Sequence, residues 1–312
     1  MTMKIMKIAA SVILLLSLPA LAQNRPGLEE HLLSDVRDAG IPVEGAQISP
    51  APSPSGKYLA FTGDNFKGIM LYSLDDGKVR ELTNLEGAGF GFEWAPSDDL
   101  VAFRGSLGKI NKKLLIAVGH PDGTVEVSSA LSDSLSLPAW KDGLVLFADW
   151  KNGSTLKSAG PESAGGFKGI KLPHPSGALV AFDNEMKASR NESGDGRVLF
   201  MPRYSEDGKI FLIHCLDGHI YLGKEGSDEL RDIGEGSSAR FARDGSCIIY
   251  EKTLDDGHRI VASDIYLYSI STRMTYRLTD TPDKIEMRPS MAEDGHTVFF
   301  DLDGRIMRGW LK

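Results

Sequence analysis

The sequence predicts an all-β protein folded as a β-propeller of four-stranded blades. The first observation is that residues 50–83 contain a turn followed by three short alternating runs. Apolar and polar residues that alternate with period two are typical of half-buried strands. The second observation is that this turn and its first strand recur along the chain. Recurring small sheets indicate a ring, because each sheet can bury its faces only against the next.

Within residues 50–83 the turn is Ser53-Pro54-Ser55-Gly56, and the strands are expected at 57–62, 69–74 and 79–83. A second turn, Asp75-Asp76-Gly77, separates the last two strands. Gly and Asp supply positive φ at such turns at little cost. With one strand ahead of the first turn, the unit has four antiparallel strands.

The unit recurs with Gly or Asp at the turn and a large apolar residue four or five positions later. The pairs are Gly56 and Phe61, Asp98 and Phe103, Gly143 and Phe147, Gly208 and Ile213, Gly245 and Tyr250, and Gly295 and Phe300. The large residue ends a strand, and its side chain is expected to enter a core shared between blades. Such repetition is the signature of a propeller.

These repeats resemble the TolB-type, WD40-like β-propeller family. The matching residues are the turns, the hairpin Leu71–Leu82 and the similar hairpin Ile265–Leu278, and the resemblance covers roughly residues 45–312. It implies a fold rather than one function, because the family's blades occur in periplasmic translocation proteins, in the non-catalytic propellers of serine peptidases and in some pectin-fragment lyases. The family's separate α/β domain has no room here, so its partner contacts are not carried over.

The middle of the chain leaves the blade number open between six and seven. The segment PHPSGALVAF, with Gly177 and Phe182, matches the first repeat and favours seven blades. Only 31 residues separate Gly177 from Gly208, which is too short for a four-stranded blade with its connections. We prefer six, with residues 170–182 as an inner hairpin of the third blade.

Three regions follow from this pattern. Residues 1–22 have a basic start, an apolar run over residues 8–18 and the small-residue site Ala20-Leu21-Ala22, which predicts a signal peptide cleaved after Ala22. The run is shorter than the roughly 20 residues that span a bilayer, so no membrane span is expected after cleavage. Residues 23–44 are a lead-in segment with a short helix expected over 28–36, and residues 45–312 are the propeller.

The last blade lacks an outer strand, because the chain ends after strands expected at 286–291, 297–301 and 305–311. An unpaired edge exposes a row of backbone donors and acceptors. We therefore expect part of residues 23–46, within 38–46, to pair beside 305–311 and close the ring.

The charge pattern limits the class of partner. The formal charge is −8, and removing Lys4 and Lys7 with the signal peptide takes it to −10. Without a basic stripe, nucleic acid is not an expected partner. We expect a monomer in the periplasm or secreted, which binds a protein or glycan partner in the cell envelope.

No residue pattern predicts catalysis, a metal or a cofactor. The histidines lack close zinc spacing, no G-x-S-x-G elbow is present, and Asp301-Leu302-Asp303-Gly304 is expected to be a hairpin turn rather than a calcium loop. Cys215 and Cys247 differ by five positions in their repeats, about 16 Å along a strand, so they are expected as separate buried thiols. Trp94 and Trp140 are expected on innermost strands, packed between blades.

The predicted binding face lies at the loops between second and third strands, where rigid blades present their tips. Its candidate residues are Asp64, Asn65, Phe66, Arg104, Asp149, Trp150, His214, Lys252, His258 and Arg259. The sequence thus favours an exported binding or scaffold protein without catalysis. The alternative is a carbohydrate-active lyase or hydrolase with a site on the axial face.

Overall fold

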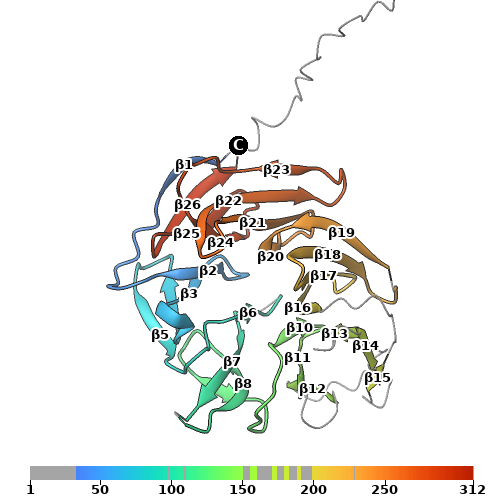
Figure 1. Ribbon diagram of the computed structural model, residues 1–312. Helices are drawn as coiled ribbons and strands as arrows, with labels where there is room; N and C mark the ends of the chain where they lie inside the picture. Colours follow the sequence, from blue (N-terminus) through green and yellow to red (C-terminus); the bar gives the residue numbers. More distant parts are fainter. Residues whose placement is uncertain are drawn as a thin grey trace, which may run out of the picture.

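The computed structural model describes residues 33–311, apart from 97–98, 109, 150–154, 160–170, 174–178, 183–187, 191–198 and 228. Its strands form five four-stranded sheets and two three-stranded sheets, arranged around a ring (Figure 1). The all-β propeller prediction is therefore confirmed. Among these residues no helix is long and apolar enough to cross a bilayer.

The four-stranded sheets are antiparallel meanders that run outward from the ring centre. The first is Ile48–Pro52 (β2), Tyr58–Thr62 (β3), Ile69–Ser73 (β4) and Val79–Thr83 (β5), with the 3-10 turn Asp64–Phe66 (η1) after β3. The second is Glu93–Trp94 (β6), Val101–Leu107 (β7), Lys113–Gly119 (β8) and Val125–Val127 (β9). Two more are Leu199–Tyr204 (β16), Ile210–Cys215 (β17), His219–Lys224 (β18) and Leu230–Glu235 (β19), and Ser237–Phe241 (β20), Cys247–Asp255 (β21), Ile260–Ser269 (β22) and Thr275–Arg277 (β23).

The ring is closed by strands from both ends of the described chain. Leu33–Asp38 (β1) pairs antiparallel with Arg305–Leu311 (β26), beside Thr297–Leu302 (β25) and Glu286–Met291 (β24). The expected closure is confirmed, but it lies earlier than residues 38–46. The helix expected over 28–36 is wrong for its described part, because Leu33 onward is strand. Pairing with the exposed edge of β26 outweighs the helical spacing of the apolar residues.

The preference for six four-stranded blades is wrong, since five are shown and the other two sheets have three described strands each. These are Ala139–Lys141 (β10), Leu144–Asp149 (β11) and Thr155–Ala159 (β12), then Lys171–Pro173 (β13), Leu179–Phe182 (β14) and Ala188–Arg190 (β15). The pairing of β13 with β14 makes a sheet with β15, separate from β10–β12. Residues 171–182 therefore do not form an inner hairpin of the third blade.

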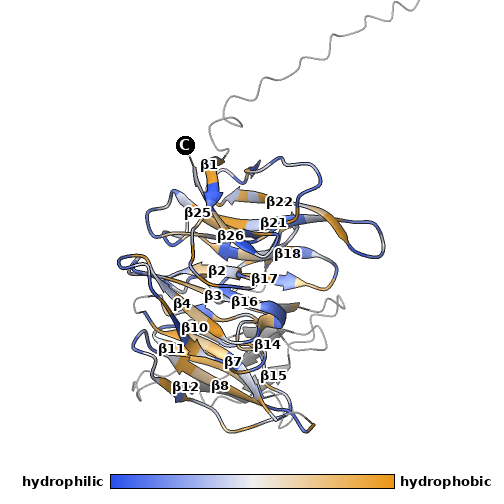
Figure 2. Cartoon of the chain, turned by 90° about the vertical axis from the view of Figure 1, so that its left-hand side faces the viewer, coloured by the Kyte–Doolittle hydropathy of each residue, from blue (hydrophilic) through white to orange (hydrophobic). Residues whose placement is uncertain are grey.

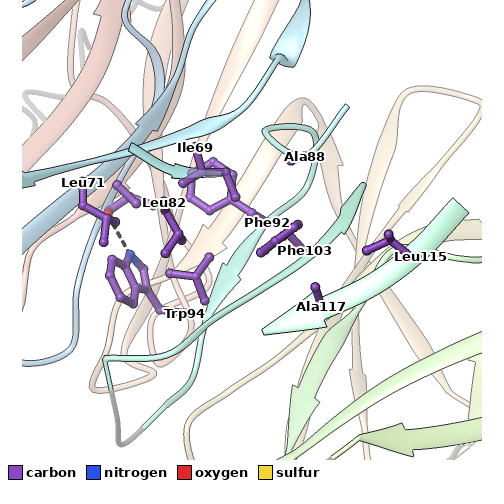
Figure 3. Close-up of a cluster of buried hydrophobic side chains, with 12 residues drawn as sticks. Ile69, Leu71, Leu82, Ala88, Phe92, Trp94, Phe103, Leu115 and Ala117 are labelled. Atoms are coloured by element: carbon purple, nitrogen blue, oxygen red, sulfur yellow. Dashed lines mark hydrogen bonds between the residues drawn. The ribbon is translucent and has the colours of Figure 1, made fainter. Parts of the chain in front are cut away.

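The cores lie between neighbouring blades. Phe103 and Trp94 pack with Leu71 and Leu82 of the preceding blade (Figure 3). Trp94 Nε1 donates to the backbone oxygen of Ala51 at 2.8 Å, and in the next blade Trp140 donates likewise to Glu93 O at 3.0 Å. The expectation that both tryptophans pack between blades is confirmed. From the side, strands such as β8 and β11 are strongly hydrophobic (Figure 2).

The turn glycines hold the left-handed conformation that the repeat predicts. Gly56, Gly245 and Gly295 have φ of 70°, 68° and 67°, and a Cβ on any of them would meet nothing within 4 Å. Replacing any one with valine is expected to lower the unfolding free energy by about 1–3 kcal/mol, from backbone strain alone. His296→Ala, one residue from Gly295 and exposed, is the control and should be nearly silent. Urea denaturation measures both, and equal losses in the two variants would contradict the alignment of the repeats.

Candidate functional site: an axial cavity lined by five blades

The innermost strands of five blades surround a cavity of about 160 Å³ at the ring axis. β2, β6, β16, β20 and β24 lie nearest the centre in Figure 1. Each strand contributes its last residues and the start of the following turn. The cavity therefore opens on the face that carries the repeated turns, not on the face of second-to-third strand loops.

Each lining strand places one side chain of the same repeat position in the cavity wall. These residues lie five positions before the turn residue of each repeat, and they are Ala51, Glu93, Arg203, Arg240 and Ser290. This position is not among the residues predicted from the sequence. The signal that could have found it is a charged residue at that fixed distance before three of the repeated turns.

Three of these residues form a charged group in the cavity. Arg203 Nη1 lies 3.5 Å from Glu93 Oε1, with both side chains largely buried. Burial raises the pKa of the Glu93 carboxyl, although Arg203 and Arg240 act against this. Burial also lowers the pKa of the Arg240 guanidinium to about 9, and the charge of Arg203 adds to that shift. The inner wall of the cavity therefore carries two guanidinium groups and one carboxyl group.

The mouth of the cavity carries a second charged group, three residues farther along each repeat. Arg243 Nε donates to Glu293 Oε2 at 2.7 Å, and its Nη2 lies 3.5 Å from Glu206 Oε1. Its Nη1 donates to Pro54 O at 2.8 Å. One arginine thus links the turns of four blades at the rim, where its two glutamate partners leave one negative charge in excess.

Another set of polar side chains lies near the opposite ends of the sheets, one position after the large apolar residue of each repeat. It comprises Thr62, Arg104, His214, Glu251 and Asp301. All except Arg104 are almost fully buried. Three accept a hydrogen bond from a backbone N–H of the next blade, as His214 from Ala239 (3.1 Å), Glu251 from Arg288, and Asp301 from Ser49 (3.0 Å).

These amides are available because the innermost strands bulge where they begin. The pairing register shifts between Ile48 and Ala51, and Ser49 has a φ of 55°. Equivalent shifts occur in β16, β20 and β24. A bulge leaves a backbone group out of the ladder, and here the preceding blade binds it. This polar set thus holds neighbouring blades together.

His214 shows how this blade contact depends on pH. Burial, with the charge of Arg203, lowers the pKa of its imidazole to about 4. The unfolded chain binds a proton on His214 near pH 6.5, so stability is fully present above that pH and falls as pH drops toward 4. The loss due to this residue is expected to reach about 3 kcal/mol.

The measurement is the unfolding free energy by urea at pH 7.5, 6 and 4.5, for the wild type and His214→Gln. Glutamine can still accept the Ala239 N–H, but it does not titrate. The difference between the two proteins should change by about 3 kcal/mol over the range. A difference that stays constant with pH would show that His214 is not held neutral.

The residues of the predicted binding face are spread over several blades, and several have structural contacts. Asp64, Asn65 and Phe66 form η1, where the Phe66 ring packs edge-on against Phe90 at 5.2 Å. Arg104 Nη1 donates to Leu135 O at 2.8 Å. Asp149 is buried and accepts a hydrogen bond from Ser132 at 2.9 Å.

The remaining members belong mainly to the β21–β22 blade. Lys252 lies over the Tyr266 ring, 4.8 Å from its centroid. His258 and Arg259 are exposed at the tip of the long β21–β22 hairpin. His214 is inside β17 and buried, rather than in a loop, and Trp150 lies outside the described residues.

Within the part of the chain that is described, no group of three or more His, Cys, Asp or Glu could hold a metal ion. Cys215 and Cys247 are free and buried, as expected of separate thiols. Asp301 and Leu302 end β25, Asp303 and Gly304 form the hairpin turn to β26, and Asp301 pairs with Arg288.

No protein-family model and no curated protein sequence matches the chain. Among solved structures it is similar to the Cps50 (Swd1) β-propeller domain of Myceliophteria thermophila, at 12% identity over 89% of this chain and 100% of that one, with a TM-score of 0.60. A putative TolB from Agrobacterium tumefaciens is 15% identical over 86% and 91% of the chains, with a TM-score of 0.53.

An oligogalacturonate lyase from Vibrio parahaemolyticus is 13% identical over 86% of this chain and 79% of that one, and its TM-score of 0.46 is too low to support an argument. At such identities the likeness concerns the fold alone. The chain is therefore a β-propeller that shares its fold with TolB-like and other propeller structures.

Proposed function

We propose that this chain is an exported, non-catalytic β-propeller that binds its ligand in the axial cavity, as a binding or scaffold protein of the periplasm or cell envelope. The observation that carries the proposal is the cavity, to which five blades contribute side chains, among them three arginines and three glutamates. A concave site with a few convergent polar groups among apolar ones is the usual form of a ligand site.

The rigid surroundings of the cavity support the same proposal. Its wall consists of innermost strands held by blade-to-blade hydrogen bonds such as those of Trp94 and Trp140. A preformed wall lowers the ordering cost of binding. The export pattern of residues 1–22 supports the location. The acidic charge disfavours nucleic acid, and the partner proposed is a protein or glycan of the envelope, bound by a monomer.

The test is an amide NMR titration of the mature protein with a panel of small acids, amines and neutral sugars. Shifts centred on residues 51–54, 93–96, 203–206, 240–243 and 290–293 are expected. Shifts confined to the β21–β22 hairpin tip or to η1 would instead favour the opposite face. Chemical conversion of a panel sugar, detected by mass, would contradict the non-catalytic role.

A further inference from the structure

The Arg240 guanidinium lines the axial cavity. Among the described residues it makes no hydrogen bond and no ion pair, whereas the neighbouring Arg203 is paired with Glu93. Burial and the like charge of Arg203 lower the pKa of Arg240, although the nearby carboxylates of Glu93 and Glu251 act against this. A charge withdrawn from water is stabilised by a counter-ion that offers hydrogen-bond acceptors. An anion beside Arg240 would supply both.

The charges around the cavity favour an anion with a single charge. Arg203, Arg240 and Glu93 leave one positive charge in excess in the inner wall. At the mouth, Glu206 and Glu293 are held by Arg243, so a dianion would meet two further carboxylates on entry. A carboxylate fits this balance better than a phosphate.

The rest of the lining is largely apolar. Pro52, Phe241 and Met291 line the same cavity as Arg240. Trp94 lines it as well, and because its indole N–H is bound to Ala51 O, the ring offers only apolar surface. A volume of about 160 Å³ is far more than one water molecule needs. The ligand therefore has an apolar body in addition to its charged group.

We propose that the axial cavity binds a small organic monocarboxylate, with its carboxylate on Arg240 and its apolar body against Pro52, Phe241 and Met291. This inference rests on the proposed function for the place of binding and adds the chemical class of the ligand. The planar fork of an arginine matches a carboxylate through two parallel hydrogen bonds.

The test is calorimetric titration with four probes: benzoate, its neutral analogue benzamide, acetate and inorganic phosphate. Benzoate is expected to bind about tenfold or more tightly than benzamide, since a charge-assisted pair contributes about that factor. It is also expected to bind more tightly than phosphate, which has no apolar body and carries more negative charge past the glutamates of the mouth. Acetate, which lacks the apolar body, is expected to bind more weakly than benzoate. Arg240→Gln should weaken benzoate at least about tenfold.

Arg259→Gln is the matched control, because Arg259 is exposed at the hairpin tip, and its benzoate affinity should stay within about twofold of wild type. Arg240→Lys keeps the charge without the fork and should fall between wild type and Arg240→Gln, which keeps the test valid if the glutamine variant does not fold. The proposal would be overturned if benzoate and benzamide bound equally, or if phosphate bound more tightly than benzoate. It would also be overturned if a folded Arg240→Gln variant bound benzoate as tightly as the wild type.

Failure of this inference differs from failure of the proposed function. Cavity amides that shift with sugars or amines but show no preference for benzoate would overturn the ligand class alone. A panel in which no compound shifts the cavity amides would overturn both.

Discussion

A chain that begins at Gln47 is expected to unfold several kcal/mol more easily than one that begins at Gly27, or to aggregate. The shorter chain loses β1, which pairs with β26. It also loses the bond from Ala39 N to Ile306 O at 2.8 Å. Ile41, which is 2% exposed, goes with them, and burying one such side chain contributes about 1.5–3 kcal/mol. The bare edge of β26 then invites pairing between molecules.

The measurement is urea denaturation together with size-exclusion chromatography of the two chains. Ile41→Ala in the longer chain separates the burial of this side chain from strand pairing, and should cost about 2–5 kcal/mol without aggregation. Similar unfolding midpoints for the chains that begin at Gly27 and Gln47 would contradict the closure of the ring by β1.

Asp301→Asn is expected to cost about 3–5 kcal/mol, because it removes one partner of a buried ion pair. Arg288 Nε donates to Asp301 Oδ2 at 2.7 Å, and its Nη2 donates to Oδ1. The same carboxylate accepts the Ser49 N–H from the first blade. Asparagine removes the ion-pair partner of Arg288 and faces it with an amide group, so the pair within this blade and the contact to the first blade weaken together.

Asp303→Asn is the matched control. Asp303 lies two residues away, is exposed and has a φ of 51°, a conformation that asparagine tolerates. It should change the unfolding free energy by less than about 0.5 kcal/mol. Arg288→Gln added to Asp301→Asn should recover part of the loss, since no unmatched charge remains. If the aspartate variants were equally stable, the pair would have no role in holding the blades.

The repeat made most of the fold predictable. The strands after Gly56 and after Gly295 match the alternating runs closely, because turn residues and period-two patterns fix them locally. The segment from Leu33 could not be read this way. Its apolar spacing is helical, and only the free edge of β26, more than 260 residues later, makes it a strand.

The site was less accessible to sequence reasoning than the fold. His214 was expected in a loop, but the bulges that start the innermost strands bring backbone donors to this position and bury it. Arg240 stands five positions before Gly245, as Arg203 does before Gly208, and this spacing could have been noticed. That both point to one cavity depends on how the blades close into a ring, which no local pattern encodes.

The most direct test of the axial site is a crystal structure of the mature protein with benzoate. We expect the benzoate carboxylate within hydrogen-bond distance of the Arg240 guanidinium and its ring against Phe241 and Met291. The Arg203–Glu93 pair should be retained. Benzoate found only on the second-to-third strand loops, with the axial cavity filled by water, would contradict it.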